Sequence, residues 1–111
     1  MNILILNRNK APELTDIYQS ILSERGHKTT VLSHLRDSDE YVSNPSRYLG
    51  QFDIALAHPT NEDARALNKE LTERENFRTV IFNISGEQEM NGRLRYATPL
   101  SRDDLINLVE N

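Results

Sequence analysis

Five short apolar runs recur along the chain and predict the strands of one sheet. Residues 3–6 and 79–84 form the clearest of these runs, without the polar alternation of a strand that is exposed on one face. Continuous runs are typical of strands buried on both faces, as in a parallel sheet. The other three runs are residues 29–32, 54–57 and 94–98.

Segments with helical spacing lie between these runs. The first has apolar residues at 14, 17, 18, 21 and 22, with Pro12 suited to its first turn and Gly26 to its end. The second begins at the capping sequence 60–63 and continues to about Glu75, and the third begins at a similar sequence, 101–104. Alternation of strands and helices predicts a parallel sheet with helices on both faces.

Two connections are irregular. Residues 33–51 predict a loop and then a short helix near 45–49, while residues 85–93 are barely long enough for one helical turn. Tyr41 and Tyr48 of the first segment could anchor it to the core or form part of an interface. We therefore predict one α/β domain over residues 1–111. It is expected to be a three-layer sandwich with a five-stranded parallel sheet and shortened second and fourth helical connections.

Composition excludes several classes of function. The 111 residues carry a net charge of −4 and no clustered basic patch, so no nucleic-acid partner is expected. There is no cysteine, which excludes disulfides and thiolate metal sites. The first apolar run is too short for a signal peptide or a membrane span, so we expect a cytoplasmic protein with no membrane partner. With four glycines and no glycine-rich phosphate loop, no cofactor is expected.

Segments around the third and fifth predicted strands resemble a known family. The sequence Tyr-Ala-Thr-Pro-Leu-Ser-Arg-Asp-Asp-Leu at 96–105 resembles the end of a response-regulator receiver domain, where a Lys-Pro dipeptide precedes an acidic helix start. Residues 52–59 resemble the strand that delivers the phospho-acceptor aspartate of that family. The resemblance extends over nearly the whole chain. It implies a receiver-like, flavodoxin-like fold and a role in two-component signalling.

The residues that a receiver needs in order to be phosphorylated are replaced here. Asn7 and Arg8 stand where the family has an acidic pair, His58 where it has the acceptor aspartate, and Thr98 where it has a lysine. Ser85 alone matches the small hydroxyl residue after the fourth strand. The resemblance therefore implies a pseudo-receiver without catalysis or metal. Such a domain would be a phosphorylation-independent module that binds another protein, of unknown identity, or a second copy of itself.

An alternative use of the same positions is an anion or small-molecule site, in a binding domain or an enzyme. Arg8, His58 and the helix start at Thr60 would all favour an anion at the carboxyl ends of the strands. The alternative without a ligand is that Arg8 is a solvated loop residue and His58 a hydrogen-bonded turn residue. His27 and His34, seven residues apart, lack a third ligand and do not predict a metal site.

Two residues near the end of the chain are candidates for an interface. Tyr96 lies in the fifth predicted strand, where receivers resemble this chain in carrying an aromatic residue, and Leu100 follows it. Tyr96 could line a face that binds a partner, or it could be an ordinary half-buried aromatic residue of a strand.

Overall fold

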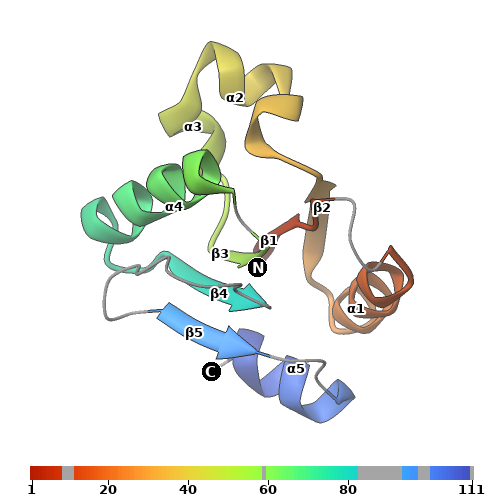
Figure 1. Cartoon of the computed structure of the whole chain (residues 1–111). Helices are drawn as coiled ribbons and strands as arrows, with labels where there is room; N and C mark the ends of the chain where they lie inside the picture. The colour runs from red at the N-terminus through yellow and green to blue at the C-terminus, as the bar shows by residue number, and fades with distance from the viewer. Residues whose placement is uncertain (9–11, 59, 83–93, 98–100, 111) are drawn as a thin grey trace.

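Five parallel strands form a single sheet at the centre of the molecule. The computed structural model describes residues 1–8, 12–58, 60–82, 94–97 and 101–110 (Figure 1). The strands lie in the order β2-β1-β3-β4-β5, and all neighbouring pairs are parallel. Their bounds are β1 Asn2–Leu6, β2 Lys28–Leu32, β3 Ile54–Ala57, β4 Arg78–Phe82 and β5 Leu94–Ala97.

Helices cover both faces of this sheet, as parallel strands require (Figure 1). α1 and α5 pack on one face, while α3 and α4 pack on the other together with the 3₁₀ turn η1 and, through Tyr41, α2. The bounds are α1 Pro12–Glu24, η1 Leu35–Asp37, α2 Asp39–Ser43, α3 Pro45–Leu49, α4 Asn61–Glu73 and α5 Arg102–Glu110. No helix in the described ranges is long and apolar enough to cross a membrane.

The core is divided by the sheet because successive side chains of a strand point to opposite faces. Ile3 and Ile5 of β1 belong to the cluster under α1 and α5, while Leu4 and Leu6 belong to the cluster under α3 and α4. The apolar residues of β1 and β3 are at most 5% exposed. The continuous apolar runs of the sequence therefore correspond to strands buried on both faces.

The α/β class stands, but the predicted fold is wrong in its second connection. Core residues are described on the four strands β2, β1, β3 and β4, and β5 pairs with β4 at the edge of the sheet. The second connection is not shortened: it contains three helical segments, η1, α2 and α3. Ser38 accepts the N–H of Tyr41 and Asn44 accepts the N–H of Arg47, so each caps a new helix. The predicted short fourth connection lies outside the described residues.

Arg74 fastens this second connection to the end of α4. Its guanidinium donates to the carbonyl oxygens of Leu49 at 2.9 Å and Phe52 at 2.8 Å, and to Glu70 at 3.0 Å. It also lies over the ring of Phe77, 5.0 Å from the ring centre. The planar fork of arginine makes these contacts simultaneously, which a lysine ammonium could not. Arg74 therefore satisfies two carbonyls where the chain leaves α3 and enters β3.

A second cluster joins the two ends of the described chain. Arg25 donates two hydrogen bonds to the carboxylate of Glu110, at 2.7 and 2.9 Å. His27 lies between Glu110, at 3.4 Å, and the amino group of Met1, at 3.3 Å. The hydrogen bond from Arg25 holds the pKa of the Glu110 carboxyl down at about 2, and contact with Glu110 raises the pKa of Arg25.

We predict that Arg74→Met, which keeps most of the buried stem, lowers the free energy of unfolding by about 2–4 kcal/mol. The reason is that it leaves two carbonyls and the buried Glu70 without a charged donor. Urea unfolding measures the change. Arg65→Met on the exposed face of the same helix is the control and should change stability by about 0.5 kcal/mol or less. Equal effects of the two substitutions would contradict the role given to Arg74.

The Glu110 contact predicts a pH dependence in the acid range. Because the folded pKa is about 2 and the ordinary value is 4.5, the contribution of Glu110 is complete above pH 4.5 and is lost as pH falls toward 2. Glu110→Gln should make stability less dependent on pH in this window, measured by thermal unfolding at several pH values. Glu73→Gln, at an exposed position, should leave the wild-type dependence intact. A parallel loss in wild type and Glu110→Gln would exclude the proposed contribution.

Candidate functional site

The carboxyl ends of β1, β2 and β3 are joined by backbone hydrogen bonds that continue past the strands. The N–H of Asn7 donates to Leu32 at 3.0 Å, and the N–H of His58 donates to Leu6 at 2.8 Å. The N–H of Arg8 donates to Ser33 at 3.1 Å. Asn7, Arg8 and His58 are all half-buried. Because β1 and β3 are neighbours, the structure places these three residues on one edge of the sheet.

Arg8 adopts an unusual backbone conformation at this edge. Its φ angle of 50° lies in the left-handed region, which residues with a side chain rarely occupy. The chain turns sharply there, directly after β1, and the hydrogen bond to Ser33 holds the turn against the end of β2. A residue with a permanent positive charge therefore follows directly after β1.

Thr60 serves as the N-cap of α4. Its hydroxyl oxygen accepts the N–H of Asp63 at 3.1 Å, which satisfies one of the free donors of the first turn. The sequence placed Thr60 among candidate anion ligands. In the structure its oxygen is committed to the helix, so the contribution of this residue to an anion site would come from its remaining hydroxyl proton alone.

Asp63 is the residue of this region that sequence reasoning did not identify. It is only 3% exposed, and Oδ1 accepts the N–H of Leu35 at 3.2 Å. Oδ2 lies 3.6 Å from Nδ1 of His34 and makes no hydrogen bond. The carboxylate thus points inward from α4 and joins that helix to the residues that follow β2. The sequence signal was present as an acid in a first helical turn, which is usually exposed and favourable there without any tertiary partner.

The remaining predicted residues are described only in part or not at all. Ser85, Thr98 and Leu100 lie outside the described residues. For Tyr96 the structure gives the backbone position in β5, opposite Ile81 of β4. The structure therefore does not place Leu100, nor Ser85 and Thr98 of the five positions compared with a receiver, and it gives only the backbone position of Tyr96.

The described strand ends do not form a metal site. Over the residues that the structure describes, no group of three or more His, Asp or Glu side chains is arranged to hold a metal ion. The one buried carboxylate there, Asp63, accepts a backbone N–H and faces a histidine. Mg²⁺ prefers several oxygen ligands in octahedral geometry. The described side chains do not supply that donor set.

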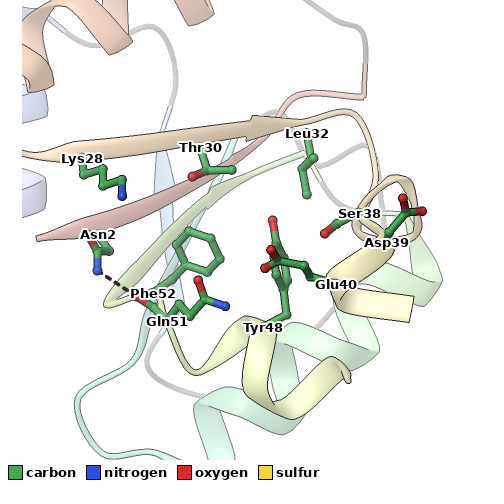
Figure 2. A pocket seen from close by; sticks show the side chains of 10 residues that line it. All are labelled: Asn2, Lys28, Thr30, Leu32, Ser38, Asp39, Glu40, Tyr48, Gln51 and Phe52. Atoms are coloured by element: carbon green, nitrogen blue, oxygen red, sulfur yellow. Dashed lines mark hydrogen bonds between the residues drawn. The ribbon is translucent and has the colours of Figure 1, made fainter. Parts of the chain in front are cut away.

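A groove opens beside the edge strand β2 and extends along its length (Figure 2). It has a volume of about 390 Å³ and lies between β2 and the short helices α2 and α3. Lys28, Thr30 and Leu32 line it from the strand, and Ser38, Asp39, Glu40 and Tyr48 line it from the helices. Asn2, Gln51 and Phe52 complete its wall. Charged and aromatic side chains therefore meet in one open groove.

Tyr48 is fixed within this groove by aromatic and polar contacts. Its ring packs edge-on against Tyr41 and Phe52, with ring centres 6.2 and 5.3 Å away. Burial raises the pKa of the Tyr48 hydroxyl, and a hydrogen bond with Ser38 partly opposes that rise. Tyr48 is thus an anchor that shapes the groove. The sequence alone is compatible with an anchor or an interface role for this residue and does not locate the groove.

Comparison with known proteins shows the fold and no family. No protein-family model matches the chain, and no curated protein matches it significantly. A solved structure of a protein from Burkholderia pseudomallei, provisionally named as pilus assembly-related, is similar with a TM-score of 0.67 and 15% sequence identity. The similarity covers 99% of this chain and 87% of the other. At this identity the two chains share a fold, and the likeness does not establish a receiver domain.

We predict that Asp63→Ala lowers the free energy of unfolding by about 2–3 kcal/mol, because the buried N–H of Leu35 loses its acceptor. In this variant, amide hydrogen exchange should accelerate more at Leu35 than at the amides of the strands. Glu62→Ala, the exposed acid next to it, is the matched control and should leave the exchange of Leu35 unchanged. Unaltered protection of Leu35 in Asp63→Ala would refute the proposed contact.

Proposed function

We propose that this protein is a pseudo-receiver, which acts by binding another protein and not by accepting a phosphoryl group. The observation that carries the proposal is the chemistry of the strand ends. Asn7, Arg8 and His58 occupy the edge where the resemblance requires acids, and the nearby Asp63 is turned into the core. A domain of this kind would have no enzymatic activity.

Charge supports this proposal. Aspartyl phosphorylation requires an acceptor carboxylate and a divalent cation held by further oxygens. At this edge Arg8 contributes a guanidinium, and its positive charge disfavours binding of a metal cation. The absence of an acidic residue at 58 removes the acceptor itself. Binding would therefore depend on the shape and charge of a constant surface.

The proposed setting is a cytoplasmic protein complex. Lack of cysteine is consistent with a reducing compartment. The Burkholderia protein of similar fold is named as pilus assembly-related, and assembly of a multiprotein complex is a role that a binding module could fill. The partner would be another protein or a second copy of this chain.

A second candidate is an anion site at the same edge. It is favoured by the placement of Arg8 and His58 after the adjacent strands β1 and β3. Phosphate or a small carboxylate is the class of ligand that a guanidinium and an imidazole would bind. Capping of α4 by Thr60 weakens this candidate, because the cap takes up the N–H of Asp63, a donor that an anion at the helix start would need.

Amide NMR with Mg²⁺ and beryllofluoride, a mimic of the phosphoryl group, tests the proposal. We expect no saturable shifts at Asn7, Arg8 or His58 in the wild-type protein. The matched variant Asn7→Asp/Arg8→Asp/His58→Asp restores three carboxylates to this edge and should gain Mg²⁺-dependent shifts there. This variant shows that the measurement can detect a receiver-type site on the same scaffold.

Two outcomes would count against the proposal. Saturable shifts in the wild type that require both Mg²⁺ and beryllofluoride would show a working phosphorylation site. Saturable shifts at Arg8 and His58 with inorganic phosphate alone, lost in Arg8→Gln, would favour the anion site.

A further inference from the structure

The outer side of β2, facing away from β1, carries backbone groups with no partner strand. Among the described residues β2 is the terminal strand of the sheet and pairs with β1 alone. The N–H of Lys28 donates to Met1 at 2.9 Å and the carbonyl of Leu32 accepts from Asn7 at 3.0 Å, so these residues turn their backbone groups toward β1. In a parallel ladder alternate residues face alternate sides. The N–H and C=O groups of Thr29 and Val31 therefore point outward.

This edge has few of the features that usually prevent pairing. Proteins protect edge strands with charges, proline, bulges or a covering segment. In β2 the one charged residue is Lys28, at the start of the strand, and the next four residues are Thr-Thr-Val-Leu. All four are half-buried and of types that favour strands or pack well. The edge is suited to receive another strand.

The charged side chains in the groove beside β2 are of opposite sign at its two ends. Figure 2 shows Lys28 at one end of the groove and Asp39 at the other, with Glu40 projecting between the helices and the strand. All three side chains belong to exposed residues. A strand lying along β2 would thus meet a positive charge at one end and negative charges at the other.

We propose that the occupant of this edge is a second copy of the chain, with the two β2 strands antiparallel about a two-fold axis at Thr30. This register pairs Thr29 of each copy with Val31 of the other, so the outward backbone groups are matched. It also brings Thr30 opposite Thr30, and threonine pairs are favourable across strands. The two sheets would become one continuous sheet. The proposal names the partner within the proposed binding function and rests on that function.

Complementary charge is the reason to choose a second copy over a foreign strand. Antiparallel pairing brings Lys28 of each copy opposite Leu32 of the other, at the end of the groove that carries Ser38 and Asp39. One two-fold operation therefore creates two identical contacts of lysine with Asp39 and Glu40. Symmetric self-complementarity of this kind is what an isologous dimer requires.

Charge reversal tests the proposal through a mixing experiment. Lys28→Glu alone and Asp39→Lys/Glu40→Lys alone should each weaken self-association about tenfold, because two attractive contacts become repulsive. An equimolar mixture should restore association, since a mixed dimer has both contacts attractive. Sedimentation equilibrium measures the three cases, and circular dichroism checks that each variant is folded. Lys69→Glu, an exposed lysine on α4, is the control and should associate like the wild type.

The failing outcomes are separate from those of the proposed function. A wild-type protein that stays monomeric at millimolar concentration would overturn the proposal and leave β2 available for a foreign strand. A dimer whose association ignores the charge reversals, or is not restored on mixing, would overturn it as well. Neither result bears on the beryllofluoride titration, which tests the strand ends of a monomer or a dimer alike.

Discussion

A parallel sheet must be covered on both faces, and here one face depends on a connection made of very short helices. η1, α2 and α3 contain three, five and five residues, too few to be stable by their own hydrogen bonds. Two charged side chains of α4 hold them in place. Asp63 binds the backbone at the start of the connection, and Arg74 binds it at the end. These two contacts hold the connection over the buried cluster that contains Leu4, Leu6 and Phe77.

The same arrangement explains why the strand ends suit a static surface. In a switch, a charged group must be able to change partners. Asp63 is buried against a backbone N–H and His34, and Arg8 is fixed in a left-handed turn bonded to Ser33. Exchanging the Asp63 contact would leave the buried N–H of Leu35 without an acceptor. This contact therefore favours a single arrangement of the residues next to the strand ends.

Sequence patterns predicted the long elements and the short helix α3, but not η1 or α2. Local patterns predict the long elements without knowledge of tertiary contacts. These patterns are the apolar runs of β1 and β3 and the helical spacing of α1 and α4. α2 has no buried residue, so it shows no periodicity that a sequence could reveal, whereas Pro45 marks the start of α3. Their boundaries are set instead by the caps Ser38 and Asn44 and by Pro45. The role of Asp63 depends on a partner 28 residues away, and the groove depends on where β2 lies in the sheet. Neither the Asp63 contact nor the position of the groove can be predicted from residues that are close in the sequence.

The cluster around His27 has a consequence for the connectivity of the domain. Through this one imidazole, the amino group of Met1 and the carboxylate of Glu110 are joined by two contacts of 3.3 and 3.4 Å. Both lie near the amino ends of the strands, since His27 directly precedes β2 and Met1 directly precedes β1. A short linker could therefore close the backbone into a ring and allow new ends to be opened elsewhere. This cluster lies at the edge of the sheet opposite the one that carries Arg8 and His58.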